Sequence, residues 1–114
     1  MIFEELPAFT RDMKSLGKKY RSLDADLVIT KKTMVVSPDA KPPFSYRIAD
    51  LGLQTCVIKV KKIACQSLKG RGVNSGLRLV YAWFELEERI VLIEIYHKAE
   101  KEVEDRERIL VNFV

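Results

Sequence analysis

Two runs rich in β-branched and aromatic residues, Leu77–Phe84 and Arg89–His97, place the strongest constraint on how this chain folds. The polar stretch Glu85–Glu88 lies between them. Apolar runs of this length around a short polar connection are typical of an antiparallel β-hairpin. We therefore expect two neighbouring strands that meet at a tight turn.

The position of that turn decides which side chains face each other. A turn at Glu87-Glu88 pairs Arg78 with His97, because the register of a hairpin follows from its turn. A turn one residue longer pairs Arg78 with Tyr96 instead. The sequence leaves both registers open.

The N-terminal third of the chain has helical periodicity. Apolar residues recur there at steps of three and four: Leu6, Phe9, Met13, Leu16 and Tyr20. This stripe predicts an amphipathic helix from Pro7 to about Tyr20. A second helix is expected from Ser22, a suitable N-cap, to about Val36, and Pro38 ends it. Their short connection predicts an antiparallel helical pair.

The remaining elements complete an α+β fold. Ile2–Glu5 and Thr55–Cys65 are predicted strands, and the proline-containing residues 38–50 are expected to form an irregular loop. A final helix is predicted from one stripe: Val103, Arg106, Glu107 and Leu110. We expect two N-terminal helices on a three- or four-stranded antiparallel sheet, followed by a C-terminal helix. The last apolar residues are free to dock on this protein or on another: Val111, Phe113 and Val114.

Length and composition fit one soluble domain spanning residues 1–114. No apolar run approaches the roughly 20 residues of a membrane span, and the first residues are acidic, so we expect a cytoplasmic protein without membrane contact. Cys56 and Cys65 would lie roughly 30 Å apart in one strand, beyond disulfide reach. Neither cysteine has the neighbours of a metal site, and no metal or cofactor is expected.

Charge is distributed unevenly along the chain. Residues 51–84 contain no Asp or Glu but carry six cations: Lys59, Lys61, Lys62, Lys69, Arg71 and Arg78. The whole chain has a formal charge of +4. A surface of one sign concentrates ligands of the other sign, so phosphate is the first candidate ligand.

Lys59 and Lys61 alternate with apolar residues in the third predicted strand, which places both ammonium groups on one sheet face. There they could grip a phosphate backbone, or serve only as a solvated face. Clustered lysines lower one another's pKa, which would suit a general base. Lys69 and Arg71 lie in a glycine-rich loop that lacks P-loop spacing, and we interpret it as a mobile basic loop.

Arg78 stands in an otherwise apolar strand, where a guanidinium usually has an anionic partner. A phosphate would suit its planar fork, and a salt bridge to Glu94 across the hairpin is the alternative. His97 is the only histidine and ends the last strand. It is either a group that titrates near neutrality beside Arg78 or an ordinary polar strand end.

The order of these elements resembles the RelE/ParE superfamily of bacterial type II toxins. The resemblance rests on the lysine strand VIKVKKIAC, the loop SLKGRGVNSG, and GLRLVYAW followed by IYHK at hairpin distance. Its RelE-like branch implies a ribosome-dependent mRNA endonuclease that uses attack by a ribose 2′-OH on the adjacent phosphate. This chemistry needs a base, cations around the phosphorane and an acid for the leaving oxygen.

Residue by residue, the resemblance implies that Lys59 and Lys61 act as base and charge stabiliser, that Arg78 holds the phosphate and that His97 transfers a proton. Lys98 matches a basic position after the last strand. The family's arginine after this lysine and its base-stacking tyrosine are absent, since Ala99 and Asp105 stand near those positions. His97 would then replace the arginine as acid, and Tyr96 is the candidate for base stacking. Further RNA contacts are expected from three cations: Lys62, Lys69 and Arg71.

The resemblance also implies partners: the ribosome with its mRNA, and a cognate acidic or amphipathic antitoxin in a complex such as a heterotetramer. Exposed Val111 and Phe113 would suit the antitoxin. Two alternatives remain at this point. ParE-like members of the superfamily inhibit DNA gyrase without cutting RNA, and a basic RNA- or partner-binding module would have no catalysis at all.

Overall fold

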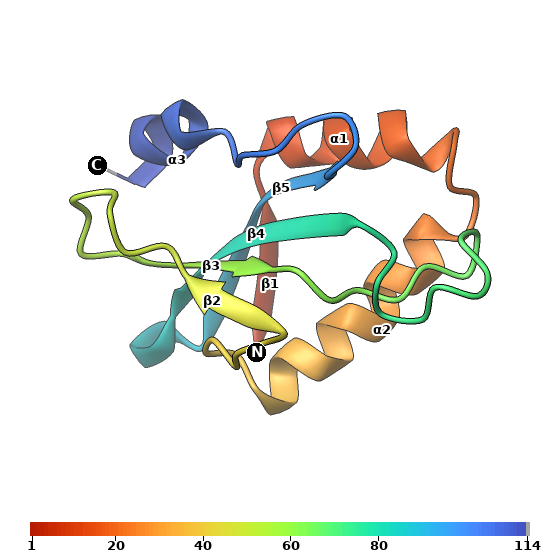
Figure 1. Ribbon diagram of the computed structural model, residues 1–114. Coiled ribbons are helices and arrows are strands. Elements are labelled where there is room, and N and C mark those ends of the chain that lie inside the picture. The colour runs from red at the N-terminus through yellow and green to blue at the C-terminus, as the bar shows by residue number, and fades with distance from the viewer. Residues whose placement is uncertain (114) are drawn as a thin grey trace.

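A computed structural model describes residues 1–113 of the chain. It has an α+β fold, as expected, with a sheet between helices (Figure 1). The elements in chain order are β1 (Ile2–Glu5), α1 (Pro7–Gly17), α2 (Leu23–Val36), β2 (Ser45–Arg47), β3 (Cys56–Val60), β4 (Leu77–Phe84), β5 (Arg89–His97) and α3 (Arg106–Phe113). The strands form one sheet in the order β1-β5-β4-β3-β2. No helix among the described residues is long and apolar enough to cross a membrane.

The sheet is mixed and has five strands, so the prediction of three or four antiparallel strands is wrong in its details. β1 runs parallel to β5, with Ile2 opposite Arg89, whereas the other neighbouring strands are antiparallel. β2 lies in the segment expected to be irregular. It pairs with β3 through only three residues, too few to produce a visible alternation in the sequence.

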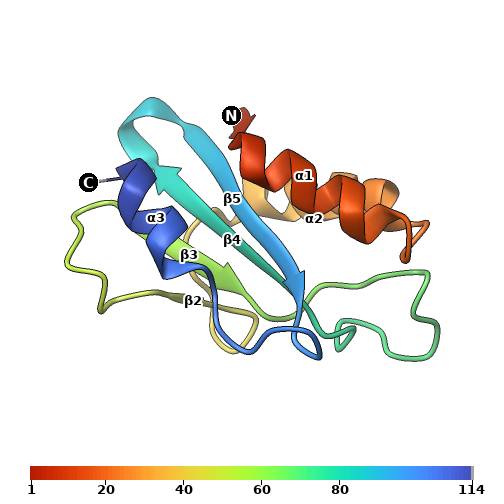
Figure 2. The same cartoon turned by 90° about the horizontal axis from the view of Figure 1, so that it is seen from above.

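The helices divide between the two faces of the sheet: α1 and α2 cover one, and α3 covers the other (Figure 2). α1 and α2 confirm the predicted helical pair, although α1 ends at Gly17 rather than near Tyr20. Their buried side chains pack on the sheet, among them Phe9, Leu16, Leu23 and Met34. The predicted stripe therefore faces a core.

The third strand is shorter than predicted. β3 ends at Val60, and residues 61–65 contribute only an isolated bridge between Ile63 and Asn74. The premise that placed both cysteines in one strand is therefore wrong, although Cys56 and Cys65 are both free.

The central hairpin has the predicted strand bounds but neither simple register. Residues 85–87 form one 3₁₀ turn, Glu88 adopts a left-handed conformation with φ 47°, and Phe84 pairs with Arg89. A β-bulge then shifts the register between Val80 and Tyr81. Beyond it Arg78 lies opposite Tyr96, so the alternative pairing with Tyr96 is confirmed and the pairing of Arg78 with His97 is wrong.

The face that carries Lys59 and Lys61 was expected to be cationic, but much of it is core. Val57, Val80 and Ala82 are buried there with Ile109 of α3, which is fully buried. The stripe predicted for the last helix is wrong, since Val103 precedes α3 and is 53% exposed. Phe113 docks on this chain against Phe84, with ring centroids 6.2 Å apart. Val111 is exposed, and Val114 lies outside the described residues.

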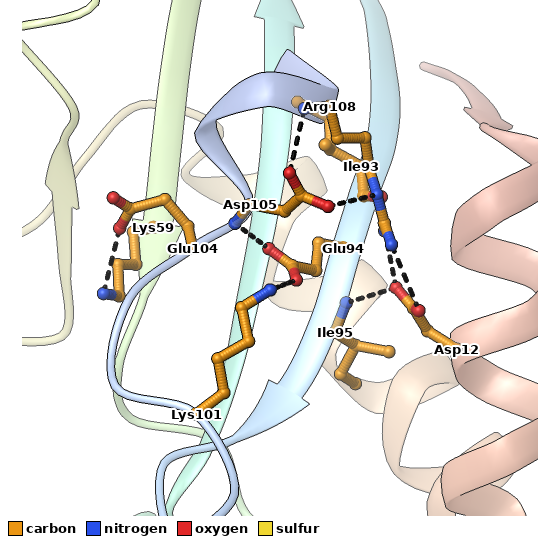
Figure 3. Close-up of polar contacts among 9 residues, drawn as sticks. All are labelled: Asp12, Lys59, Ile93, Glu94, Ile95, Lys101, Glu104, Asp105 and Arg108. Atoms are coloured by element: carbon orange, nitrogen blue, oxygen red, sulfur yellow. Dashed lines mark hydrogen bonds and ion pairs between the residues drawn. The ribbon is translucent and has the colours of Figure 1, made fainter.

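Side chains from both faces of the sheet meet at the β-bulge. Arg108 of α3 donates to the Ile93 carbonyl at 2.8 Å and to Asp12 of α1 at 2.7 Å. Asp12 in turn accepts a hydrogen bond from the Ile95 backbone N–H at 3.3 Å. These side chains satisfy backbone groups of β5 beyond the end of β1. Figure 3 shows how α1, β5 and α3 meet there.

Candidate phosphate-binding site

Four cations line one open cavity of about 310 Å³, which lies where β3 ends and β4 begins. They are Lys61, Lys62, Arg78 and Lys98, and the lining is completed by Pro43, Tyr46, Asn74 and Gly76. We call this the cationic cavity. Among the described residues, none of its four cations makes a salt bridge. Positive charge without a carboxylate partner is what an anion requires.

Arg78 is fixed by backbone rather than by an acid. One guanidinium nitrogen donates to the Lys61 carbonyl at 2.8 Å and to the Leu77 carbonyl at 3.3 Å. The alternative partner Glu94 pairs instead with Lys101. The remaining N–H groups of Arg78 have no described hydrogen-bond partner, so the fork is oriented but still able to bind phosphate.

The other cations come from segments that flank β4. Lys62 donates to the Asn74 side chain at 2.8 Å, which links the end of β3 to the glycine-rich loop. The Lys98 backbone N–H donates to the Gly76 carbonyl at 2.9 Å and places Lys98 beside the start of β4. Three chain segments distant in sequence thus deliver charge to one place.

Lys59 does not line the cationic cavity. Its ammonium forms an ion pair with Glu104 at 3.1 Å, and the two side chains are only 14% and 8% exposed (Figure 3). Burial alone would lower the pKa of Lys59, but neighbouring Tyr96 and Glu104 outweigh burial and the net pKa is raised. The idea that clustered lysines depress this pKa is therefore wrong, and Lys59 is held as a charged amine.

Tyr96 is enclosed rather than available to a base. It is 6% exposed, and the ammonium groups of Lys59 and Lys101 lie 5.7 and 5.2 Å from its ring centroid. A stacking platform needs an open ring face. The structure leaves little of this ring for that purpose.

His97 lies on the sheet face that α1 and α2 cover, opposite to the face of Arg78. Its ring stacks on Tyr20 with centroids 5.8 Å apart. Nε2 lies 3.0 Å from the Ser75 carbonyl, and Nδ1 accepts from the Ala99 N–H at 3.0 Å. Both contacts are satisfied by a neutral imidazole that carries its proton on Nε2. His97 thus supports the loop behind the cationic cavity.

Gly76 separates His97 from the cavity and has no room for a side chain. A Cβ at this position would lie 2.6 Å from His97 Nε2, and the backbone has φ +91°. We expect Gly76→Ala to lower the free energy of unfolding by about 2–4 kcal/mol, from backbone strain and overpacking together. Thermal or denaturant unfolding measures the loss.

Gly70→Ala is the matched control for that substitution, because Gly70 has φ +81° but no atom within 4 Å of its added Cβ. It should lose only the backbone component, roughly 1–2 kcal/mol. Equal losses in the two variants would contradict the close approach of His97 to Gly76.

The loop cations Lys69 and Arg71 are exposed and lie outside the cavity. Of the nine residues predicted to act on RNA, the structure gathers four, while Lys59, Tyr96, His97 and the two loop cations lie elsewhere. Sequence reasoning missed Tyr46, Asn74 and Gly76 as lining residues. The sequence offered only weak signals for them: Gly76 directly before a predicted strand, Asn74 in the glycine-rich loop, and Tyr46 shortly after two prolines. None of these signals indicates an anion site by itself.

The arrangement can hold a phosphate and stabilise added negative charge on it. Among the described residues, no group of three His, Cys, Asp or Glu side chains could hold a metal ion. Comparison with models of known families, with curated proteins and with solved structures found no match to this chain.

Proposed function

We propose that this protein is an RNA-binding toxin of the RelE-like kind, which cuts mRNA on the ribosome and is neutralised by a cognate antitoxin. The observation that carries the proposal is a set of four cations around one cavity, none of which has an acid partner in the part of the chain that the structure describes: Lys61, Lys62, Arg78 and Lys98. Phosphate is the group that such a cavity would recognise, and a chain of phosphates suits charges supplied by several segments.

Cleavage would proceed from within the cationic cavity. Lys61 serves as the base that takes the proton of the 2′-OH, and the O2′–P bond forms as the P–O5′ bond breaks. Arg78 stabilises the charge on the phosphorane, and the Lys98 ammonium gives its proton to the leaving 5′ oxygen. The products are a 2′,3′-cyclic phosphate and a 5′-OH. In the proposed scheme His97 supports this site from the opposite sheet face, and Lys59 lies beside the site in its ion pair with Glu104.

A second candidate is a module that binds RNA without cutting it. The specific observation in its favour is that only Lys61 and Arg78, of the four residues assigned catalytic roles from the sequence, line the cavity. With Lys59 in an ion pair and His97 on the other face, binding would be the simpler activity.

Purified protein added to a translation extract and to a gyrase supercoiling assay separates these functions. The proposal expects cleavage of mRNA only when ribosomes are present. RNA binding without cleavage would support the second candidate, and loss of supercoiling would point to gyrase inhibition. The antitoxin is expected to be acidic or amphipathic and to cover the cationic cavity, in a heterotetramer or another complex.

We expect that expression without an antitoxin arrests growth and that Arg78→Ala relieves the arrest. Arg71→Ala is the matched control, because it removes the same charged group from the same acid-free stretch but outside the cavity. Growth after induction is the measurement, with circular dichroism to show that both variants fold. If Arg71→Ala relieves the arrest as fully as Arg78→Ala, the cavity is not the active site.

A further inference from the structure

The cationic cavity accounts for the phosphates of an RNA strand but leaves its bases without an evident contact. Its charged and polar lining offers bases little apolar surface. Single-stranded nucleic acid is usually held by cations along the backbone together with aromatic rings on which bases stack. Tyr46 is the one aromatic residue among the eight that line the cavity.

Tyr46 is well placed for such a contact. It lies in β2, the last strand at one edge of the sheet. Tyr46 pairs with Lys59 of β3, and it therefore shares the sheet face that carries Lys61 and Arg78. Within residues 1–113 no strand lies beyond β2, and Tyr46 is 40% exposed. The Lys61 ammonium lies 5.1 Å from the centroid of its ring. Ring and phosphate-binding cation are therefore immediate neighbours.

The backbone around Tyr46 is held firmly. The next residue, Arg47, forms a two-pronged ion pair with Asp39 at 2.9 and 2.6 Å, and the preceding Ser45 side chain accepts from the Lys41 N–H at 2.8 Å. Pairing with β3 fixes the strand on its inner side. A ring on a fixed backbone loses little entropy when a base stacks on it.

The other aromatic rings do not compete for this role. Tyr20, Tyr81 and Tyr96 are each at most 6% exposed. Phe44 is 45% exposed but lines a different, mostly apolar cavity beside α2. Only Tyr46 combines an accessible ring with a place in the cationic cavity.

We infer that Tyr46 is a base-stacking platform, and that the cationic cavity with Tyr46 forms a subsite for one nucleotide of single-stranded RNA. This inference rests on the proposed RNA-binding function. The phosphate lies among Lys61, Arg78 and Lys98, and the attached or adjacent base lies on the Tyr46 ring. The Lys61 ammonium can leave the ring for the phosphate, because an exposed cation–π contact is weak.

The test measures binding of a labelled single-stranded RNA of about ten nucleotides and of the same strand lacking its bases. Loss of one base stack weakens binding about 5- to 150-fold. Tyr46→Ala should show this loss on the normal strand, whereas Tyr46→Phe, which keeps the ring, should stay within about twofold of the original protein. On the abasic strand Tyr46→Ala should bind as the original protein does.

Each other outcome has a definite meaning. If Tyr46→Ala binds the normal strand as well as the original protein does, or weakens both strands equally, Tyr46 is not a stacking platform, while RNA binding itself stands. If the unaltered protein binds neither strand, the proposed function fails and the inference fails with it. Thermal unfolding of Tyr46→Ala shows whether the edge strand is intact.

Discussion

Lys59→Met is expected to lower the free energy of unfolding by about 3 kcal/mol, because it leaves the Glu104 carboxylate buried without its ion-pair partner. The two side chains are 14% and 8% exposed, so water screens the charge poorly. The Arg106 guanidinium remains 3.5 Å from the Glu104 carboxylate. Because this second cation still partly neutralises the carboxylate, the expected loss of stability lies near the lower end of the range for a broken buried ion pair. Urea unfolding measures the difference.

Two comparisons isolate the buried pair. Lys59→Met with Glu104→Leu replaces it by apolar groups of similar volume and should restore stability to near the original value. Lys19→Met breaks the exposed pair of Lys19 with Glu100 and should lower stability much less than Lys59→Met does, because water screens the exposed charges. If Lys59→Met lowers the free energy of unfolding no more than Lys19→Met does, the buried ion pair does not stabilise the fold more than an exposed one.

The pair also makes stability depend on pH in a defined direction. Burial raises the pKa of Glu104, but the hydrogen bond and charge of Lys59 outweigh burial, and the net pKa is lowered. This contribution is present above the unfolded Glu pKa, about 4.3, and is lost as pH falls through the lowered value. The raised pKa of Lys59 gives stability that is present below about pH 10.4 and lost as pH rises further. The double variant should lack both dependences.

Glu94→Ala is expected to cost about 3 kcal/mol, because Glu94 is 3% exposed and satisfies two donors of the C-terminal segment. Its carboxylate pairs with Lys101 and accepts the Asp105 N–H at 2.7 Å, directly before α3 (Figure 3). Without it, α3 loses the contact that positions its first turn on the sheet. Hydrogen exchange of the α3 amides should therefore speed up.

Glu94→Gln is the control, since its amide oxygen can still accept from Asp105 while the charge is lost. It should cost roughly half as much as Glu94→Ala. Amides in β4 should remain protected in both variants. If exchange in α3 does not change in Glu94→Ala, Glu94 does not hold the C-terminal segment in place.

Local pattern was enough to predict much of the fold. The α1 stripe, the Pro38 stop and the bounds of β4 and β5 follow from side-chain period and turn chemistry over a few residues. The direction of β1 did not follow, because its partner β5 lies more than 80 residues away in the chain. β2 and the bulge in β5 also depend on pairing between distant strands, which no local pattern contains.

The same distinction applies to the candidate site. The acid-free stretch contains Lys61, Lys62 and Arg78, which line one cavity, and their separation from carboxylates in sequence persists in space. For Lys59 that reasoning failed, since Glu104 arrives from 45 residues further along the chain. The predicted role of His97 depended on the register of the hairpin. With the observed turn and bulge, His97 pairs with Leu77 instead of Arg78, and its side chain lies on the face that α1 and α2 cover.

RNA binding by two charge-matched double variants tests the central claim most directly. Lys61→Met with Arg78→Met removes two cations from the cavity, and Lys69→Met with Arg71→Met removes two from the exposed loop. If the cationic cavity binds the RNA backbone, the first variant binds single-stranded RNA far more weakly, and its slope of log affinity against log salt falls by about 1.4. The loop variant should keep nearly the original affinity and slope. Equal weakening of both variants would mean that RNA responds only to net charge, and would contradict the account.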